Sequence, residues 1–465
     1  MMNERKMRLA YIFADYLSTL AGVMVFTLVR FLLVSDIRMR YVEMSAFFGS
    51  YGLKLTLSLF PLFMLGLYYL SGYYVNVTNK SRVTEFLSTG MSVAVGALIF
   101  FMVVLLNDVL PRRVMNYEIL LVFFVCLFVP VYLTRLVLTS LWISHWRGSK
   151  LENVVVISGS DTCPDAVADI IVRSNKCIRS IIGIDVHNSD IQAELSVSRL
   201  SAAMRDAGAT AFVVALPADN PELILRVLGC LYPLDRAIYV SPDDYTLLVS
   251  RVPYDNLLSE PLVDISRSSL SDSVVSMKRA SDVVGSLAGL LCVTPVIAAL
   301  ALAIKLKSPG PVFYSQERIG YHRKPFKIYK LRTMTVDAEI EGPSLSSDND
   351  PRVTTIGRFM RKYRLDELPN LWNVLRGDMS LVGPRPEREY FLSQLRVRAP
   401  HCALLHQVRP GLTSLGMVKF GYASTVDDMV ARLKYDLLYI QNISVSLDLK
   451  VIFYTFRTIF RGEGK

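Results

Sequence analysis

The stretch Val283–Leu306 reads VVGSLAGLLCVTPVIAALALAIKL and carries a polar residue and a proline, Thr294-Pro295, near its middle. Its length is close to the roughly 20 residues that cross the hydrocarbon core of a bilayer. Pro295 has no N–H, and its ring clashes with the carbonyl one turn earlier in a helix, which favours a break into two half-helices. The sequence therefore predicts a membrane helix over residues 281–307 that is broken at Thr294-Pro295.

Basic residues stand at both ends of this run. Lys278 and Arg279 precede it, and Lys305 and Lys307 lie at its end. A spanning helix normally carries most of its positive charge on the cytoplasmic side, so both ends prefer the same side of the membrane. A re-entrant helix, which enters and leaves through one leaflet, satisfies this preference, with Thr294 hydrogen-bonded to backbone groups freed at the bend. A kinked helix that spans the bilayer fully is the alternative.

Four apolar windows precede this run, at Leu9–Val34, Leu55–Leu70, Leu87–Leu106 and Leu120–Leu141. Each is close to spanning length, and the first has no cleavage signature, so we expect it to stay in the mature protein. Arg135 lies near a helix end and is expected to extend toward the interface. Residues 1–147 are thus predicted to form a four-helix transmembrane bundle that returns the chain to its starting side. Buried helices of a soluble protein are the alternative.

The composition of the whole chain agrees with a membrane protein of several domains. It has 465 residues, of which 52% are apolar and 20% charged, and a net charge of +10. This length predicts two or three domains. Basic cytoplasmic flanks account for the positive charge, so we do not expect nucleic acid as a partner. The six cysteines lie far apart in the sequence, which disfavours a disulfide scaffold and a structural zinc site.

Residues 148–248 change to a β-α-β rhythm, which predicts a doubly wound α/β module of Rossmann-like type. The expected elements are strands Val154–Ile157, Ile181–Val186, Ala211–Leu216 and Ala237–Val240, with helices Pro164–Arg173, Leu195–Ala207 and Pro221–Leu231. The first strand ends in Ser158-Gly159-Ser160-Asp161, which lacks the glycines of a dinucleotide loop and adds a carboxylate that repels a pyrophosphate. We therefore expect a structural or regulatory module without NAD. Residues 249–276 are predicted to be a linker.

Adjacent carboxylates follow among several basic residues in the polar part of the chain. Asp366 and Glu367 lie in the segment Arg361–Pro386, and the basic segments Gly310–Gly320 and Phe326–Met334 precede it. One carboxylate is suited to attack phosphorus while the other helps to hold Mg²⁺, and guanidinium groups donate paired hydrogen bonds to phosphate oxygens. The same residues are also typical of solvated surface clusters, so this pattern alone leaves both interpretations open.

Several longer motifs decide between them: Lys278-Arg279 with Asp282, Gly310-Pro311-Val312, Lys330–Met334, Leu365–Pro369 and Gly377–Pro386. With these motifs, residues 277–465 resemble the bacterial sugar transferase family. These are the monotopic phosphoglycosyl transferases that initiate O-antigen, capsule and exopolysaccharide synthesis. The four helices and the α/β module in front look like the large branch of that family, of the hexose-1-phosphate transferase type.

The resemblance implies a two-step exchange on a mainly α-helical catalytic domain. Asp366 corresponds to the nucleophile that attacks the β-phosphate of a UDP-sugar and releases UMP. Polyprenyl (undecaprenyl) phosphate then accepts the sugar phosphate from the covalent intermediate. Glu367 corresponds to the partner of Asp366, both are expected to hold Mg²⁺, and Arg361 matches the phosphate-binding arginine.

The other residues expected at the substrates are Arg318, Lys330, Arg332, Pro384, Arg385 and Pro386. Pro384-Arg385-Pro386 matches the uridine-side motif of the family. Two positions depart from the family pattern: Thr294-Pro295 stands where Ser-Pro is frequent, and Ser414 stands where Gly is usual. Threonine keeps the hydroxyl group, so we expect the first departure to have a mild effect.

Because four crossings return the chain to its starting side and UDP-sugars are made in the cytosol, we expect a bacterial cytoplasmic (inner) membrane protein whose N-terminus, α/β module and catalytic domain face the cytoplasm. Its expected partners are the bilayer, a second copy in a homodimer and downstream glycosyltransferases. An apolar segment with interspersed basic residues, Val445–Phe460, is expected to be an interfacial helix in the headgroup plane. Two other functions stay open: a membrane-anchored nucleotide-sugar dehydratase, which requires an intact glycine fingerprint, and a non-catalytic scaffold for polysaccharide export.

Overall fold

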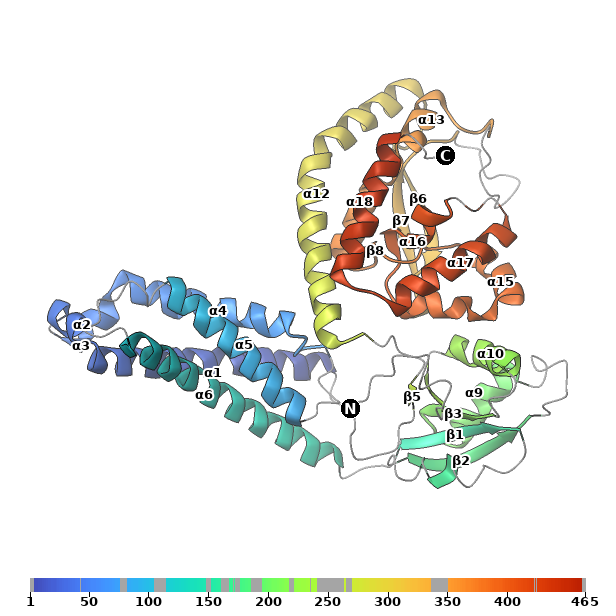
Figure 1. Ribbon diagram of the computed structural model, residues 1–465. Helices are drawn as coiled ribbons and strands as arrows, with labels where there is room; N and C mark the ends of the chain where they lie inside the picture. Colours follow the sequence, from blue (N-terminus) through green and yellow to red (C-terminus); the bar gives the residue numbers. More distant parts are fainter. Residues whose placement is uncertain are drawn as a thin grey trace. The chain divides into compact units, whose positions relative to one another are not determined.

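The computed structural model of the chain forms two compact units (Figure 1). One comprises residues 1–149 and 271–277, and the other comprises residues 150–270 and 278–465. The residues described in it are 4–41, 43–75, 82–103, 114–147, 152–159, 167–169, 171, 176–184, 195–216, 221–234, 236–240, 263–264, 270–335, 350–421, 423 and 425–461.

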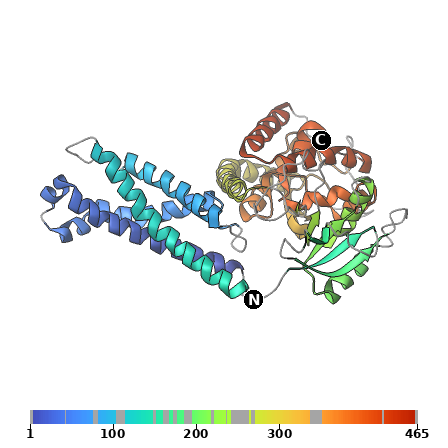
Figure 2. The same cartoon turned by 60° about the horizontal axis from the view of Figure 1, so that its bottom comes forward.

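Long apolar helices make up the first unit: α1 (Glu4–Leu33), α4 (Tyr51–Leu70), α5 (Arg82–Val103) and α6 (Val114–Arg147), with short α2 (Ser35–Arg40) and α3 (Met44–Gly49) after α1. Helix α1 packs against α4 and α6, and α5 also packs against both (Figures 1 and 2). With α12 (Asp272–Lys307), the described chain has five helices long and apolar enough to cross a bilayer. The expectation of a membrane protein is therefore confirmed.

A buried ion pair joins three of these helices. Arg135 of α6 donates hydrogen bonds of 2.8 and 2.7 Å to the carboxylate of Asp15 in α1 and one of 2.7 Å to Thr89 in α5. Arg135 is fully buried, so the expectation that it extends toward the interface is wrong. The reason is that Asp15 supplies an opposite charge, which lowers the cost of keeping a guanidinium inside the helices.

A five-stranded sheet lies in the second unit, with β1 (Glu152–Ser158), β2 (Lys176–Gly183), β3 (Ala211–Ala215), β4 (Ala237–Val240) and β5 (Val263–Asp264). Its order is β2-β1-β3-β4-β5, in which the first four strands are parallel and β5 is antiparallel to β4. Among doubly wound sheets, the order 2-1-3-4 is that of flavodoxin-like proteins and differs from the dinucleotide-binding order. The Rossmann-like type therefore stays a prediction.

The module differs locally from the sequence-based expectation. Strand β2 begins at Lys176 because this residue pairs in register with Glu152 and forms an ion pair with it. Strand β5 lies inside the segment that we expected to be a linker. The helices α9 (Val197–Asp206) and α10 (Pro221–Leu231) match two expected helices. Most of the expected helix Pro164–Arg173, and the loop residues 160 and 161, lie outside the described residues.

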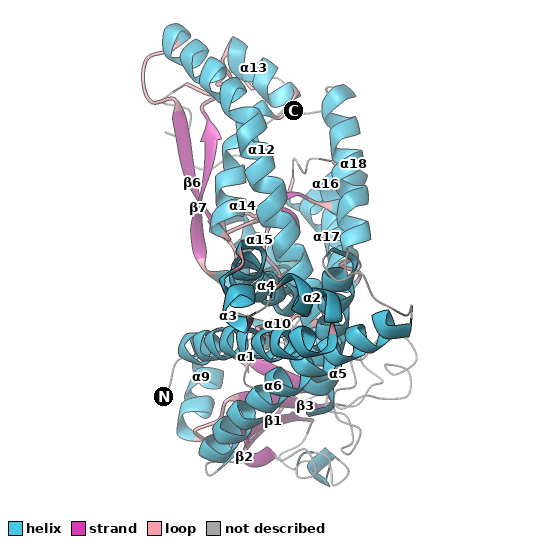
Figure 3. Ribbon diagram, turned by 90° about the vertical axis from the view of Figure 1, so that its left-hand side faces the viewer, coloured by secondary structure: helices cyan, strands magenta, loops and turns pink. Residues whose placement is uncertain are grey.

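The C-terminal part is mainly helical, as predicted. Its elements after α12 are the hairpin β6 (Phe313–Ile319) and β7 (Pro325–Leu331), α13 (Thr355–Lys362), the 3₁₀ segment η4 (Leu365–Asn370), α14 (Leu371–Arg376), β8 (Ser380–Val382), α15 (Glu389–Arg398), the 3₁₀ segment η5 (Pro400–Gln407), β9 (Gly411–Thr413), α16 (Leu415–Lys419), α17 (Val426–Gln441) and α18 (Val445–Arg461). Helix α18 occupies the segment expected to be the interfacial helix (Figure 3).

Helix α12 continues through Thr294-Pro295 over 36 residues, so the expected break into two half-helices is wrong. Its ribbon instead curves in the C-terminal part (Figure 1). Thr294 donates a 2.6 Å hydrogen bond from its hydroxyl to the carbonyl of Leu290. Pro295 lacks the N–H that would bond the carbonyl of Leu291, whereas the Thr294 hydroxyl bonds the adjacent carbonyl of Leu290. Both features are typical of a helix that bends without separating.

Both ends of α12 contact the C-terminal part of the chain. Near its start, Lys278 donates to the carbonyl of Val382 at 2.8 Å. Arg279 donates to the carbonyl oxygens of Val374 and Leu375 at 2.7 and 2.8 Å. Near its end, Ile304 is 1% exposed and packs in one cluster with Leu331 and Met360. The C-terminal part of the chain and helix α12 are therefore joined at two separate places.

Candidate active site

The carboxylates of Asp366 and Glu367 lie in η4, and the neighbouring strand β7 fixes this segment. The side-chain oxygen of Asn370 accepts a 2.9 Å hydrogen bond from the N–H of Tyr329, and the amide of Asn373 donates one of 2.7 Å to the carbonyl of Lys327. Both asparagines are buried. Two side chains thus attach η4 and α14 to the edge of the hairpin, which leaves the two carboxylates facing strand β7.

Glu367 is 7% exposed and is paired with two cations. Its Oε1 accepts a 2.7 Å hydrogen bond from the ammonium of Lys330 and a 3.4 Å one from Arg385. Burial by itself raises the pKa of Glu367, but the charges of Lys330, Arg385 and Arg364 outweigh it and hold the pKa below its usual range. Glu367 is therefore ionised at any physiological pH.

Asp366 is 8% exposed and has a different electrostatic environment. Burial raises the pKa of Asp366 to about 6; the charge of Glu367 adds to this rise, and Lys330 and Arg361 oppose it. The two neighbouring carboxylates therefore differ in basicity although they share one site. Asp366 is still mostly ionised at neutral pH, and its raised basicity suits a nucleophile or a proton acceptor.

Helix α13 places Arg361 beside this pair. Its N-terminus is capped by the hydroxyl of Thr354, which accepts a 3.0 Å hydrogen bond from the N–H of Gly357. A side chain at Gly357 would clash with the carbonyl of Thr333, so only glycine permits this close approach. Arg361 then donates from Nε to the hydroxyl of Thr333 at 2.9 Å. This hydrogen bond orients the guanidinium of Arg361. In that orientation the guanidinium is suited to donate hydrogen bonds to phosphate oxygens.

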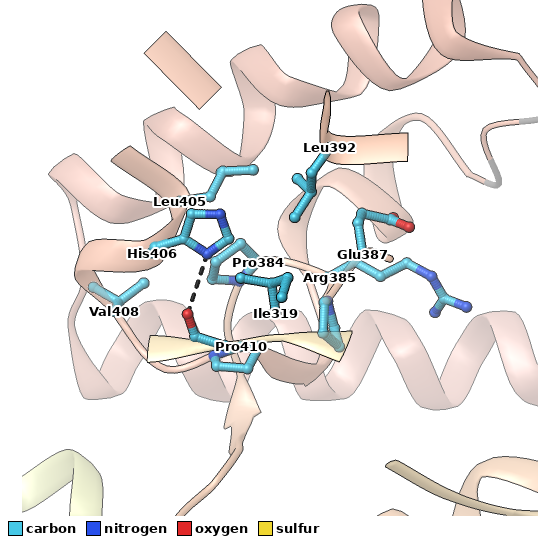
Figure 4. A pocket seen from close by; sticks show the side chains of 11 residues that line it. Ile319, Pro384, Arg385, Glu387, Leu392, Leu405, His406, Val408 and Pro410 are labelled. Atoms are coloured by element: carbon cyan, nitrogen blue, oxygen red, sulfur yellow. Dashed lines mark hydrogen bonds between the residues drawn. The ribbon is translucent and has the colours of Figure 1, made fainter. Parts of the chain in front are cut away.

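The motif Pro384-Arg385-Pro386 borders a small hollow at the surface (Figure 4). His406 lies on one side of the hollow and makes a 3.2 Å hydrogen bond through Nδ1 with the carbonyl of Gly320. Burial lowers the pKa of His406 to about 4, so its imidazole is neutral at physiological pH. The hollow is therefore largely apolar and uncharged on that side, while Arg385 extends toward Glu367.

Two predicted substrate residues are bonded to other parts of the protein. Arg332 donates to the carbonyl oxygens of Ser308 and Pro309 at 2.9 and 2.7 Å, just after the end of α12. Arg318 donates to Gln316 at 2.8 Å and forms a 3.5 Å ion pair with Glu387. The predicted site residues that the structure brings together are Asp366, Glu367, Arg361, Lys330 and Arg385. Arg332 and Arg318 instead form hydrogen bonds and an ion pair with neighbouring segments. Thr294-Pro295 lies within α12.

Several residues at the site had not been predicted: Asn370, Asn373, Arg364, Glu387 and His406. For the two asparagines a signal was present, since polar residues three positions apart lie on one face of a helix and can face the same neighbour. Glu387 had no such signal, because its partners Arg318 and Arg432 lie far away in the sequence.

The carboxylates present fit a magnesium ion that also binds a phosphate. Within the described part of the chain, no group of three or more His, Cys, Asp or Glu side chains is placed to hold a metal. Mg²⁺ is usually bound through one or two carboxylates together with substrate phosphates and water. Asp366 and Glu367 therefore suit a metal that arrives with a diphosphate rather than a permanent structural ion.

Comparison with known proteins agrees with this geometry. Residues 273–462 match the family model described as Bacterial sugar transferase. The exopolysaccharide production protein PSS of Rhizobium leguminosarum bv. phaseoli is 39% identical over 202 residues, which are 40% of this chain and 98% of that protein. The chain is a member of the bacterial sugar transferase family. The matched region contains all of α12 but its first residue, and it contains both carboxylates.

Other members of the family have names that describe a reaction. The UDP-N-acetylgalactosamine-undecaprenyl-phosphate N-acetylgalactosaminephosphotransferase of Aeromonas hydrophila is 40% identical over 217 residues, which are 47% of this chain and 51% of that protein. The UDP-glucose:undecaprenyl-phosphate glucose-1-phosphate transferase of Escherichia coli (strain K12) is 37% identical over 228 residues, 49% and 48% of the two chains. The chain thus spans about half the length of these two relatives.

We expect Lys330→Met to lower the free energy of unfolding by about 3 kcal/mol at neutral pH, because it leaves the buried Glu367 carboxylate without its nearest cation. The pKa of folded Glu367 lies below its ordinary value of 4.5, so this contribution is complete above that pH and is lost as the pH falls below it. Thermal unfolding of the detergent-solubilised chain, followed by intrinsic fluorescence, measures the effect.

The matched control is Lys327→Met, which removes an exposed cation from the same strand. The difference between Lys330→Met and wild type should be largest near pH 7 and should shrink below about pH 4.5. A difference that is constant over this pH range would contradict the ion pair as its cause.

Proposed function

We propose that the chain is a phosphoglycosyl transferase, which moves a sugar 1-phosphate from a UDP-sugar to a polyprenyl phosphate such as undecaprenyl phosphate. The observation that carries the proposal is the buried pair of carboxylates with opposite pKa shifts, next to Arg361, in a member of this family. Relatives named for this type of transfer support the substrates. The product would enter capsule, O-antigen or exopolysaccharide synthesis, where glycosyltransferases extend it.

In the first step the carboxylate of Asp366 attacks the β-phosphorus of the UDP-sugar. A bond from a carboxylate oxygen to phosphorus forms, the bond to the bridging oxygen breaks, and UMP leaves with its electron pair. In the second step a phosphate oxygen of the polyprenyl phosphate attacks the same phosphorus and the carboxylate of Asp366 leaves. The burial of Asp366 removes water that would otherwise hydrolyse this acyl phosphate.

The other side chains in the site lower the repulsion between the reacting anions. Arg361 and Arg385 carry positive charges that suit the oxygens of a diphosphate. Lys330 holds Glu367 ionised in a fixed position. Mg²⁺, held by Asp366 and Glu367 together with the diphosphate, would neutralise phosphate charge and make UMP a better leaving group. Pro384 and Pro386 flank Arg385, and we propose that this segment contacts the uridine side of the donor.

The family match favours this function over the two alternatives. A nucleotide-sugar dehydratase needs a dinucleotide loop, and Ser158-Gly159 of the described chain already departs from that fingerprint. A scaffold without catalysis does not require a buried carboxylate pair held by two cations. For the α/β module we propose a structural or regulatory role without NAD, and for the whole chain an assembly of homodimers.

We also propose that α12 is re-entrant and that the α/β module and the catalytic domain face the cytoplasm, at the inner membrane. The contacts at both ends of α12 support this topology, because Arg279 and Ile304 pack against segments of the same catalytic unit. A helix that spans the bilayer would place these two ends on opposite sides. The UDP-sugar is water-soluble, so a catalytic unit on the cytoplasmic side can reach it.

Asp366→Asn should lower the rate of transfer more than about a thousandfold, because an amide cannot act as the nucleophile. The matched control, Asp427→Asn, changes an exposed aspartate at the start of α17 that pairs with Arg398 and should leave the rate unchanged. Product analysis with purified chain, a radiolabelled UDP-sugar and undecaprenyl phosphate should find UMP and ping-pong kinetics. Release of UDP with sequential kinetics would overturn the proposal.

The rate of the first step should fall about tenfold for each pH unit below about pH 6, because the protonated form of Asp366 cannot attack. Lys330→Met should move this acidic limb to higher pH, since Lys330 lowers the pKa of Asp366. Single-turnover UMP release at several pH values measures the shift. An acidic limb that Lys330→Met leaves in place would show that another group controls the rate.

The topology predicts that Ser281→Cys and Lys307→Cys, in an otherwise cysteine-free chain, react with an impermeant maleimide from the cytoplasmic side only. These positions flank the membrane part of α12 and are exposed. Ser45→Cys, between α1 and α4, is the control and should react from the opposite side. Labelling of positions 281 and 307 from opposite sides would show that α12 spans the bilayer.

A further inference from the structure

Two carboxylates and two arginines form a network next to the Pro384–Pro386 segment. They are Arg318, Glu387, Arg432 and Asp436, and we call them the Glu387 network. Glu387, Arg432 and Asp436 are 8%, 5% and 2% exposed, so these three side chains lie in the interior and not on the surface. The two steps of the proposed transfer use neither Arg432 nor Asp436.

Glu387 is bonded to both arginines of the network. Its Oε1 accepts a 2.7 Å hydrogen bond from Arg432, and its Oε2 forms a 3.5 Å ion pair with Arg318. Burial by itself raises the pKa of Glu387, but the charges of Arg432 and Arg318 outweigh it and hold the pKa below its usual range. The ionised carboxylate therefore links strand β6, which carries Arg318, to helix α17, which carries Arg432.

The segment in front of Glu387 has little freedom to move. A proline flanks Arg385 on each side, and a proline ring fixes its own φ at about −65°. The carbonyl of Pro384 accepts a 2.9 Å hydrogen bond from the N–H of Gly411, and the carbonyl of Glu387 accepts one of 3.0 Å from Ile319. Few backbone torsions are thus free between Glu387 and Arg385, so a displacement of Glu387 is passed on to Arg385.

Arg432 also supports a second contact of Arg385. The N–H of Gly416 in α16 donates a 3.1 Å hydrogen bond to Asp436, and a side chain at Gly416 would lie 2.7 Å from Cγ of Arg432. Helix α16 is therefore packed directly on α17. Its buried Met417 accepts a 3.4 Å hydrogen bond through sulfur from Arg385. Arg432 thus acts on Arg385 from two sides, through Glu387 and through α16.

Arg385 connects this network with the carboxylate pair, because it also donates a 3.4 Å hydrogen bond to Glu367. In Figure 4 the side chains of Arg385 and Glu387 extend to the same side, away from His406. We propose that Arg432 is a positioning residue for the donor: with Glu387, it holds Arg385 in the orientation in which the guanidinium binds the diphosphate of a UDP-sugar. The inference rests on the proposed function, which supplies this donor.

Stability of the fold alone does not account for the network. Replacement of a buried ion pair by apolar side chains of similar volume is often neutral or stabilising, because each buried charge has lost its water. Directional bonds between charged groups instead define one arrangement of the segments that carry them. An orienting role accounts for the charges, since Arg385 needs a defined direction to donate paired hydrogen bonds to phosphate oxygens.

The test compares nucleotide binding and turnover in the full chain, purified in detergent. Calorimetry with UDP and Mg²⁺ measures binding of the diphosphate without turnover. Arg432→Gln should weaken UDP binding about tenfold, an effect typical of residues that orient a ligand-binding group. In transfer assays, KM for a UDP-sugar that the wild type uses should rise by about the same factor. The kcat should fall by less than about threefold, because Lys330 still holds Glu367.

The matched control is Leu433→Ala, because Leu433 follows Arg432 on α17 and is 1% exposed. This substitution leaves a cavity and should lower the thermal midpoint at least as much as Arg432→Gln does. Its affinity for UDP should stay within about twofold of the wild-type value, since the Glu387 network is intact. Equal losses of UDP affinity in the two variants would show that Arg432 only stabilises α17, and would overturn the inference.

A double-mutant cycle tests whether Arg432 acts through Glu387. Glu387→Gln alone should weaken UDP binding about tenfold, and the double variant with Arg432→Gln should be no weaker than that, because both changes remove the same bond. Independent effects would multiply to about a hundredfold loss and would contradict the proposed route. If Arg432→Gln does not fold, Glu387→Gln measured against Leu433→Ala gives the same comparison.

The outcomes separate this inference from the proposed function. A wild-type chain that binds no UDP would overturn the proposed donor and the inference together. Normal binding by the wild type that Arg432→Gln leaves unchanged would overturn the inference alone. Because calorimetry with UDP does not require turnover, the result is also independent of the result for Asp366→Asn.

Discussion

The pairing of Glu367 with Lys330 and Arg385 is the interaction on which the active site depends. A buried carboxylate without a partner would take up a proton, whereas these cations keep Glu367 negative in a fixed place. That negative charge, together with burial, then raises the pKa of its neighbour Asp366. One charge arrangement thus produces two carboxylates of different basicity from adjacent residues, as the proposed nucleophile and its partner would require.

The same physical constraint organises the rest of the chain. Inside the first unit, Arg135 forms a buried ion pair with Asp15, and this pair joins helices from distant parts of the sequence. At the start of α12, Lys278 pairs with Asp448 of α18, so the membrane helix is attached to the C-terminal helix. Glu387 is held by Arg432 behind the Pro384–Pro386 segment. In each case, a charge removed from water fixes the position of the element that carries its partner.

Much of the architecture could be predicted because its signals are local. A run of about 20 apolar residues predicts a membrane helix whatever it packs against, and all five expected membrane helices are present. Two predictions failed where distant contacts decide. Lys176 extends β2 through its pairing with Glu152, and Arg135 is buried beside Asp15. Neither partner could be identified from the neighbouring sequence. A third prediction failed locally, because Thr294-Pro295 bends α12 without breaking it.

The sequence by itself determined the family, the membrane helices and the adjacent carboxylates, because each is encoded in consecutive residues. Only the tertiary structure decided how the two carboxylates differ, since Lys330 and Arg385 approach Glu367 from β7 and from the segment after β8. It also decided which predicted arginines lie beside the carboxylates, because the guanidinium of Arg332 is bonded to the carbonyl oxygens just after the end of α12. A pKa and a hydrogen bond depend on distance in space and on burial, and neither follows from the order of residues along the chain.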